Sequence, residues 1–393
     1  MARMLTDRER LILLNLIPEI GTIRVQRLLA AFGSLQELFA APEDQLWQVE
    51  GIGQVLARRF ATQCRNPQPV EEELHLAKQA GCAVVTQRDV DFPTPLKQIP
   101  DPPLVLYMKG QWVDEDQVAV AVVGSRRASL YGQQIAERLA YDLAIRGVTV
   151  ISGLARGIDA AAHRGALKAH GRTLAVLGNG LASIYPPEHK ELAEQVAERG
   201  AVLSEYPMRM EPLAQNFPRR NRLISGLSLG VVIVEAARRS GALITADCAL
   251  EQGREVFAVP GKVDSVTSQG THQLLKQGAR LVTSVEDILE ELRLVPLTAG
   301  GAEPAGGSTV VAAGLAEAET RVLACVEADP RTIDAIALES GLGMPEVSSL
   351  LLQLEVKHLV RQLPGKRFIK IAGGLRIEAG NASSSPEPRS PSR

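Results

Sequence analysis

Residues 118–132, VAVAVVGSRRASLYG, decide the fold. Residues 118–123 are apolar or small, which is typical of a strand buried on both faces. A tight Gly-Ser-Arg-Arg turn follows at residues 124–127, and apolar residues at 135, 139 and 143 predict a helix from about residue 131. This strand–turn–helix unit is how a doubly wound α/β fold presents backbone N–H groups to a phosphate. We therefore expect an anion to bind at this turn.

The glycine spacing of the turn argues against a dinucleotide cofactor. A GxGxxG turn needs its second and third glycines, whereas Gly124 is followed by no glycine before Gly132. The second strand leads into SGLARG (152–157) rather than an acidic residue, and the chain has no GxxxxGKS/T loop. These residues therefore argue against a dinucleotide cofactor and weaken an ATPase interpretation. On the turn alone, Arg126 and Arg127 are either ligands of an anion or solvated surface residues.

The composition indicates two or three domains and a local binding surface. The chain has 393 residues, of which 45% are hydrophobic, and a formal net charge of −2, so it is no globally basic nucleic-acid coat. Its four cysteines lie far apart without CxxC spacing, which indicates reduced thiols and no zinc site. No signal peptide or run of membrane-spanning length is evident, so we expect a soluble cytoplasmic protein.

The central part of the chain alternates strands and helices. This alternation predicts an α/β fold with an extended Rossmann-like, mostly parallel, doubly wound sheet over residues 118–293. The expected strands are 118–123, 148–152, 173–177, 201–204, 230–234, 255–259 and 280–282. The expected helices lie near 131–146, 157–169, 188–199, 218–228, 241–253, 270–277 and 284–293.

The flanking segments predict two smaller domains. Residues 1–65 indicate a helical domain in which Gly51-Ile52-Gly53 resembles a helix-hairpin-helix turn, although the related first turn has Glu19 in place of the leading glycine. A plain helical bundle is the alternative there. The remaining expected parts are a connector at 66–117 with strands at 83–86 and 104–108, a linker at 294–316, a winged-helix-like domain at 317–371 and a disordered tail at 372–393.

Chemistry is expected beyond the carboxyl ends of the strands, because parallel α/β sheets bind ligands there. The turns at those ends collect glycines, arginines and Lys262, and arginine forms bidentate pairs with phosphate. The segment NFPRRNR (216–222) places Pro218 at a helix start and arginines in the first turn, against the helix dipole. Phe217 is either a stacking platform for a base or an ordinary hydrophobic staple.

Catalysis is weakly indicated. Asp159 and His163 stand four residues apart, and Glu205 and Glu235 follow strands, but the chain offers no evident nucleophile–base pair or metal set. We expect no enzyme. The alternative is a nucleotide-processing enzyme similar to a nucleotide phosphoribohydrolase, with Glu235 acting on a mononucleotide.

Several long motifs resemble the DprA/Smf family of bacterial DNA-processing proteins. They are SGLARGIDAAAHRGAL (152–167), LGNGLASIYPPEH (177–189), NFPRRNRLISGLS (216–228), SGALITADCALEQGREVFAVPG (240–261) and QGTHQLLKQGAR (269–280). The resemblance covers roughly residues 80–290. It implies a single-stranded DNA-binding recombination mediator of natural transformation that needs no cofactor and forms homodimers. Such a protein protects incoming single-stranded DNA, acts where single-strand-binding protein covers DNA, and loads the RecA recombinase.

The resemblance also implies the DNA-binding residues. Relatives often have a lysine shortly before the Phe-Pro pair, whereas this chain reads PLAQN at 212–216, which puts the path of the strand in doubt. A dimer contact is expected around residues 272–275, and the winged helix is expected to contact protein. The implied DNA-binding residues are Gly124, Ser125, Arg126, Arg127, Gly153, Arg156, Gly157, Phe217, Arg219, Asn221, Arg222, Thr245 and Lys262.

Overall fold

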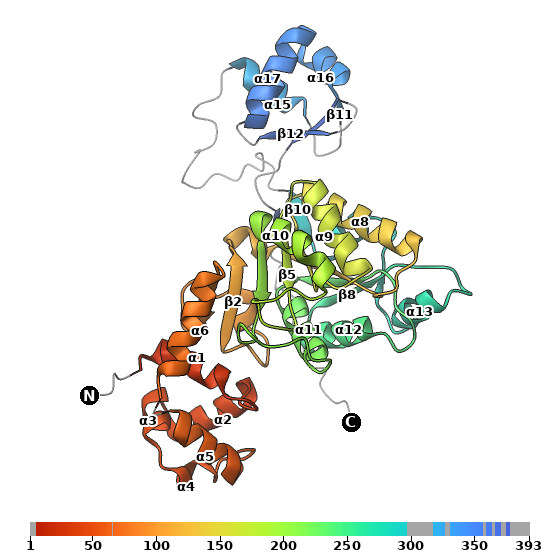
Figure 1. Cartoon of the computed structure of the whole chain (residues 1–393). Coiled ribbons are helices and arrows are strands. Elements are labelled where there is room, and N and C mark those ends of the chain that lie inside the picture. Colours follow the sequence, from red (N-terminus) through yellow and green to blue (C-terminus); the bar gives the residue numbers. More distant parts are fainter. Residues whose placement is uncertain are drawn as a thin grey trace, which may run out of the picture.

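The computed structural model describes residues 5–64, 66–296, 317–326, 331–356, 359–363, 366–370 and 375–377. Within them, a nine-stranded sheet forms the centre of the molecule, in the order β1-β2-β6-β5-β4-β3-β7-β8-β9 (Figure 1). Strands β3 to β9 run parallel, and β1 and β2 extend the β6 edge antiparallel. The strands are β1 (Ala83–Thr86), β2 (Val105–Gly110), β3 (Ala119–Val123), β4 (Thr149–Ser152), β5 (Thr173–Val176), β6 (Ala201–Ser204), β7 (Gly230–Ile233), β8 (Glu255–Ala258) and β9 (Arg280–Leu281).

Helices cover both faces of this sheet, which confirms the predicted fold class. Val120 and Val122 of β3 pack with α8, α9 and α14, whereas Ala119, Ala121 and Val123 pack with α11, α12 and α13. This alternation explains why the strand is apolar throughout. The helices are α7 (Thr94–Lys97), α8 (Leu130–Ile145), α9 (Ile158–Lys168), α10 (Lys190–Arg199), α11 (Asn216–Gly226), α12 (Gly241–Glu251), α13 (Gln269–Lys276) and α14 (Val285–Glu291).

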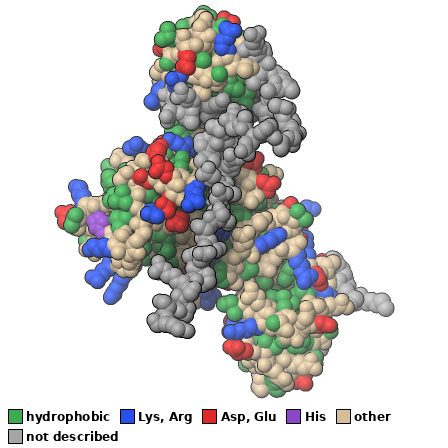
Figure 2. Space-filling view, turned by 180° about the vertical axis from the view of Figure 1, so that it is seen from behind, with side chains coloured by type: hydrophobic (Ala, Val, Ile, Leu, Met, Phe, Trp, Pro, Cys, Tyr) green, Lys and Arg blue, Asp and Glu red, His purple; other side chains and the backbone are tan. Residues whose placement is uncertain are grey.

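The order of the strands in the sheet changes direction at β3 and β7, which are neighbours in the sheet but not in the sequence. Strands β3 to β6 add toward one edge, and β7 to β9 then add on the other side of β3. Such a switch point opens a crevice at the carboxyl ends of the two central strands. Acidic and basic side chains are interspersed over the face of the molecule in Figure 2, in keeping with the net charge of −2. A surface with an excess of positive charge must therefore be local, and the carboxyl ends of the central strands are where a parallel sheet binds ligands.

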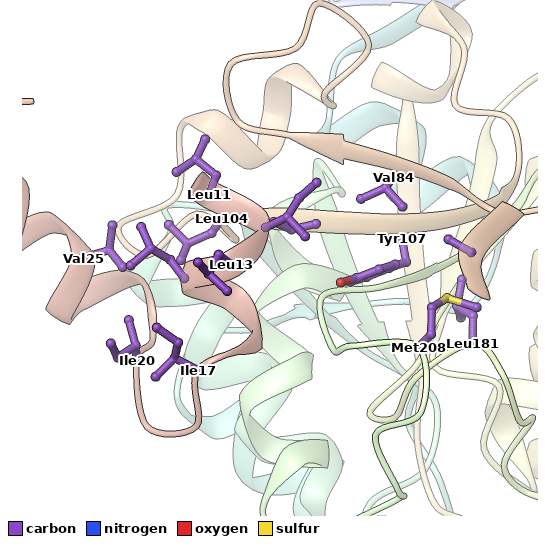
Figure 3. Packing of buried hydrophobic residues seen from close by; sticks show 14 of the residues in the cluster. Leu11, Leu13, Ile17, Ile20, Val25, Val84, Leu104, Tyr107, Leu181 and Met208 are labelled. Atoms are coloured by element: carbon purple, nitrogen blue, oxygen red, sulfur yellow. The ribbon is translucent and has the colours of Figure 1, made fainter. Parts of the chain in front are cut away.

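The amino-terminal helices share a core with the β1–β2 edge. Figure 3 shows Leu11 and Leu13 of α1 beside Leu104, which directly precedes β2, and the same buried cluster extends to Tyr107 of β2. The segment expected as a connector contains α6, which the sequence did not predict, and its two strands belong to the main sheet. The helices are α1 (Asp7–Leu16), α2 (Thr22–Phe32), α3 (Leu35–Ala40), α4 (Glu43–Leu46), α5 (Gln54–Gln63) and α6 (Gln68–Gln79).

Two turns in this helical part have the same backbone form. Gly51 has φ +85°, and Glu19 takes φ +73° although it is not glycine. The Arg24 guanidinium donates to the carbonyl oxygens of both residues, so it ties the two turns together. The two turns therefore share a positive φ at the corresponding position, although only the second has a glycine there.

The carboxyl-terminal part contains the expected winged helix. Its strands pair in the order β11-β13-β12, next to a cluster of buried apolar side chains from its helices. Strand β14 (Leu375–Ile377) pairs antiparallel with β10 (Leu294–Pro296), so part of the range expected as a disordered tail forms a strand. The other elements are α15 (Glu317–Ala324), β11 (Arg331–Thr332), α16 (Ile333–Ser340), α17 (Met344–Val356), β12 (Val360–Leu363) and β13 (Arg367–Lys370). Most of the expected linker at 294–316, and the wing turn at 364–365, lie outside the described residues.

Candidate nucleic-acid interface

The turns at the carboxyl ends of β3, β4 and β7 are held together by backbone contacts. The Ser125 N–H donates to the carbonyl of Glu235 at 2.8 Å, and the Ile158 N–H donates to the carbonyl of Ser125 at 3.3 Å. Gly157 has φ +76°, and a Cβ there would lie 2.3 Å from the Ser125 oxygen. Gly124 is equally constrained, because a Cβ would lie 2.6 Å from Ile158. The predicted glycines thus act by letting the turns approach one another.

The N-terminus of α8 is occupied by a side chain of the protein itself. The Glu235 carboxylate is 4% exposed and accepts hydrogen bonds from the Ser129 N–H at 2.9 Å, from the Ser129 hydroxyl and from the Thr267 hydroxyl at 3.3 Å. A Cβ on Gly132 would lie 2.4 Å from the Glu235 carboxyl carbon. The Glu235 side chain therefore fills the predicted phosphate position at this helix.

A second internal carboxylate fills the turn after β4. Asp159 is 6% exposed, and its carboxylate accepts the N–H groups of Gly153 at 3.2 Å and Ala155 at 3.3 Å. Burial raises the pKa of Asp159, while the Arg220 charge opposes that shift. A Cβ on Gly153 would lie 2.6 Å from the Arg220 guanidinium and 2.7 Å from the Asp159 carboxylate. Two backbone donors of this turn, the Gly153 and Ala155 N–H groups, are thus satisfied internally.

Arg220 is a buried structural residue. It is 3% exposed and donates to the carbonyl oxygens of Gly153, at 2.9 Å, and Val176. Burial lowers the pKa of Arg220 to about 10, which leaves it charged at neutral pH. It joins β4, β5 and α11 from within, a role that the sequence did not distinguish from that of its arginine neighbours.

His163 does not form an acid–base pair with Asp159. Its Nδ1 lies 2.7 Å from the Thr173 hydroxyl, and the ring is fully buried. Burial lowers the pKa of His163 to about 3, so the imidazole is neutral. The four-residue spacing therefore reflects packing.

The Phe217 ring lies at the centre of a cluster of aromatic and guanidinium groups. The Arg126 Cζ lies 4.9 Å from the ring centroid, the Tyr185 ring lies 5.7 Å away, and the buried Arg220 lies at 6.0 Å. The ring also packs on Gly178, where a Cβ would lie 2.9 Å from it. Because Arg126 is exposed and Phe217 half-buried, this aromatic–guanidinium cluster presents one solvent-facing cation over an aromatic ring.

Helix α11 begins earlier than predicted. It starts at Asn216, after a turn in which the Asn216 N–H donates to the Leu213 carbonyl at 2.9 Å, so Pro218 is the third helical residue. Proline is tolerated there because the first helical N–H groups have no partner within the helix. This shift changes which arginines of NFPRRNR face solvent.

Several predicted DNA-binding side chains are committed to internal partners. Arg222 is paired with Asp101, at 2.9 Å, and with Glu205. Arg156 is exposed but paired with Glu188. Asn221 is buried and donates to the Gly241 carbonyl at 3.3 Å, and Thr245 is 2% exposed within α12. The structure thus does not bring these four side chains to the surface as free ligands.

The remaining predicted basic residues are exposed. Arg126, Arg127, Arg219 and Lys262 form no ion pair with any other residue that the structure describes. Tyr185 completes the aromatic–guanidinium cluster but was missed, although it lies in the segment LGNGLASIYPPEH after β5. The signal in the sequence that could have identified Tyr185 is its position in the loop that follows β5.

Metal and membrane features are absent from the described ranges. These residues contain no group of three or more histidine, cysteine or acidic side chains that could hold a metal ion. No described helix is both long and apolar enough to span a bilayer.

The described residues combine a doubly wound domain, whose ligand edge carries exposed guanidinium groups, with a winged helix. Residues 83–293, more than half of the chain, match the family described as "DNA recombination-mediator protein A", and residues 307–366 match the "DprA winged helix domain". This chain therefore belongs to the DprA/Smf family, and its role lies in DNA processing and recombination.

Individual relatives cover most of the chain. "Protein Smf" of Escherichia coli (strain K12) is 42% identical over 323 residues, which span 81% of this chain and 85% of that protein. "Protein Smf" of Synechocystis sp. is 35% identical over 379 residues, with 89% and 95% covered. The X-ray structure of DNA processing protein A (DprA) from Streptococcus pneumoniae matches 73% of this chain and 98% of its own, with 33% identity and a TM-score of 0.64. The resemblance inferred from the motifs is confirmed.

Proposed function

We propose that the protein is a single-stranded DNA-binding recombination mediator and not an enzyme. The observation that carries this proposal is the exposed Arg126 guanidinium over the half-buried Phe217 ring, beside the exposed Arg127. Phosphates of the strand bind the guanidinium groups, and a base stacks on the ring once Arg126 swings from the ring to a phosphate. Duplex DNA binds poorly, because its bases are paired and cannot reach the ring.

The two internal carboxylates support binding by side chains alone. Glu235 accepts the Ser129 N–H at the start of α8, and Asp159 accepts the Gly153 and Ala155 N–H groups after β4. A strand phosphate therefore gains its contacts from exposed arginines, without release of a buried carboxylate. The same occupation of the turns argues against a nucleotide substrate, because a mononucleotide phosphate would need those donors.

The wider role follows from family membership. We propose that the protein works in the cytoplasm during natural transformation and forms a homodimer whose two copies meet through the segment 272–275. We also propose that it loads RecA on DNA covered by single-strand-binding protein. Two weak sites on one strand gain affinity through effective concentration when the protein is dimeric. Sedimentation of the full chain, with and without DNA, tests the dimer, and recombinase assembly on covered oligonucleotides tests the loading.

The central experiment is a titration of labelled oligothymidine and of a duplex of equal length at two salt concentrations. We expect tight, salt-dependent binding of the single strand and weak binding of the duplex. Arg126→Ala lowers the affinity by about 1–3 kcal/mol, the scale of hydrogen bonds to a charged group. Arg164→Ala, an exposed arginine on α9 away from the strand ends, is the matched control. Equal binding by the parent protein and Arg126→Ala would refute the site.

A further inference from the structure

The turns after β7 and β8 adjoin the turn that carries Arg126. The Ala236 N–H donates to the Thr267 carbonyl at 2.8 Å, and the Gly270 N–H donates to the Ala236 carbonyl at 2.7 Å. Since the carbonyl of Glu235 also accepts the Ser125 N–H, a continuous chain of backbone contacts runs across the switch point. Side chains that follow β7 and β8 therefore share one rim with the β3 turn.

Two arginines on this rim have no role in the site described above. Arg238 and Arg239 follow β7, and both are exposed. Neither forms an ion pair with any residue in the described ranges, and the first turn of α12, which follows them, contains no acidic residue. The acidic residue nearest in sequence, Glu235, is buried and bonded to Ser129. These two guanidinium groups are therefore available to an external anion.

Lys262 continues the same rim at the end of β8. It is exposed, and its loop is fixed by the His272 Nε2, which lies 3.0 Å from the Gly261 carbonyl oxygen. Tyr131 is also exposed, and its hydroxyl lies 3.5 Å from the Pro260 carbonyl oxygen. Figure 2 shows Lys and Arg side chains gathered at the end of the sheet domain that carries α13, on the left of that view.

The opposite direction along the edge contains paired as well as free cations. Arg156 is bound to Glu188, and Arg222 is bound to Asp101 and Glu205. Arg209, in the loop after β6, and Arg219 are exposed and form no ion pair with any described residue. A phosphate can use a paired group only by displacing a carboxylate, whereas a free arginine releases counterions at once. Arg238, Arg239 and Lys262 form a run without a paired cation among them, which favours that direction of travel from Phe217.

We propose that the phosphodiester backbone of single-stranded nucleic acid leaves the aromatic–guanidinium cluster across the β3–β7 switch point and binds Arg238, Arg239 and Lys262. This inference rests on the proposed function and adds the direction of the strand. A short oligomer fills the cluster alone, and a longer one reaches the arginines after β7.

The experiment compares end-labelled oligothymidines of about 6 and about 20 nucleotides, one near the lower end of the roughly 4–16 nucleotides that a single OB fold covers and one beyond its upper end. For the double variant Arg238→Ala/Arg239→Ala, we expect at least about 10-fold weaker binding of the longer oligomer. The salt slope should be smaller by about 1.4, because each phosphate that an arginine neutralises on a single strand adds about 0.7 to the slope. Binding of the shorter oligomer changes by less than about 2-fold. Arg164→Ala, with an equally exposed arginine on α9, leaves both affinities unchanged.

Two outcomes overturn the inference. One is parent-like binding of the longer oligomer by the double variant, and the other is weaker binding by Arg156→Ala than by the double variant. Both leave the proposed function standing if Arg126→Ala still binds the shorter oligomer more weakly than the parent protein. If the parent protein binds neither oligomer, the proposed function itself fails. Circular dichroism checks that each variant is folded. We expect it to be, because the substituted side chains are exposed.

Discussion

Replacement of Glu235 by alanine tests the claim that the protein fills its own anion position. The carboxylate holds the Ser129 N–H at 2.9 Å, the Ser129 hydroxyl, and the Thr267 hydroxyl at 3.3 Å. Hydrogen bonds to a charged group contribute about 1.5–3 kcal/mol each, and a negative charge at a helix N-terminus contributes about 0.3–2 kcal/mol. Because such terms are not additive, we expect the free energy of unfolding to fall by about 3–5 kcal/mol, as when other buried networks are broken.

The assay combines urea titration with anion rescue. In Glu235→Ala the vacated space at the start of α8 is expected to receive inorganic phosphate, because N–H donors and the helix dipole favour it. Phosphate at ten times its Kd restores about 1.4 kcal/mol compared with chloride at equal ionic strength. Glu235→Gln is the control, because it keeps the volume and a neutral acceptor, and we expect it to lose less stability and to gain nothing from phosphate.

Two results would refute this reasoning. If Glu235→Ala unfolds at the same urea concentration as the parent protein, the carboxylate does not hold the helix. If the parent protein is stabilised by phosphate as much as Glu235→Ala, the position is not filled by the side chain. Either result would mean that Glu235 does not block the α8 N-terminus and that a phosphate of the DNA strand can bind there.

Three further changes probe the same edge of the sheet. Phe217→Ala should weaken oligothymidine binding by about 1–3 kcal/mol in a fluorescence titration, whereas Phe217→Trp should retain it, because any aromatic face stacks with a base. Gly157→Ala should lower the urea midpoint, at a cost of about 2–4 kcal/mol, because a Cβ would lie 2.3 Å from the Ser125 oxygen at φ +76°; an unchanged midpoint would contradict the close approach. Burial lowers the pKa of His163 from 6.5 to about 3, so the unfolded chain binds this proton more readily and stability falls as pH drops below 6.5. The loss from this group between pH 8 and pH 5 should be about 2 kcal/mol and should be absent from urea titrations of His163→Gln.

Much of the sheet could be predicted because its strands can be recognised from their own residues. The run of residues 118–123 is apolar throughout because both of its faces are covered, and the observed strand is Ala119–Val123. The winged helix was predicted for a similar reason, from short helices followed by a hairpin. Helix α6 was missed because its proline-rich start resembled a connector, although Val70 and Ala77 lie on its buried face.

The direction of the first two strands could not be predicted from their own residues. Strand β2 pairs antiparallel with β6, and the register aligns Tyr107 with Ser204, residues far apart in the chain. Only the assembled sheet determines that pairing. The apolar pattern of β2 is the same for either direction.

The roles of the arginines were the least predictable part of the site. In the sequence, Arg219, Arg220 and Arg222 are equivalent members of one basic segment. The start of α11 at Asn216 sets the helical phase that buries Arg220 and leaves Arg219 exposed. The partner of Arg222, Asp101, comes from a distant loop. Burial and long-range pairing, which no local pattern encodes, decide which cations are free.

Because β10 pairs with β14, the winged helix is an insertion between two strands that lie side by side. A domain attached at both ends explores a smaller volume than one hanging from a single tether, because closing a loop removes conformational freedom. The antiparallel pairing of Leu294–Pro296 with Leu375–Ile377 therefore limits how far the winged helix can move from the sheet domain.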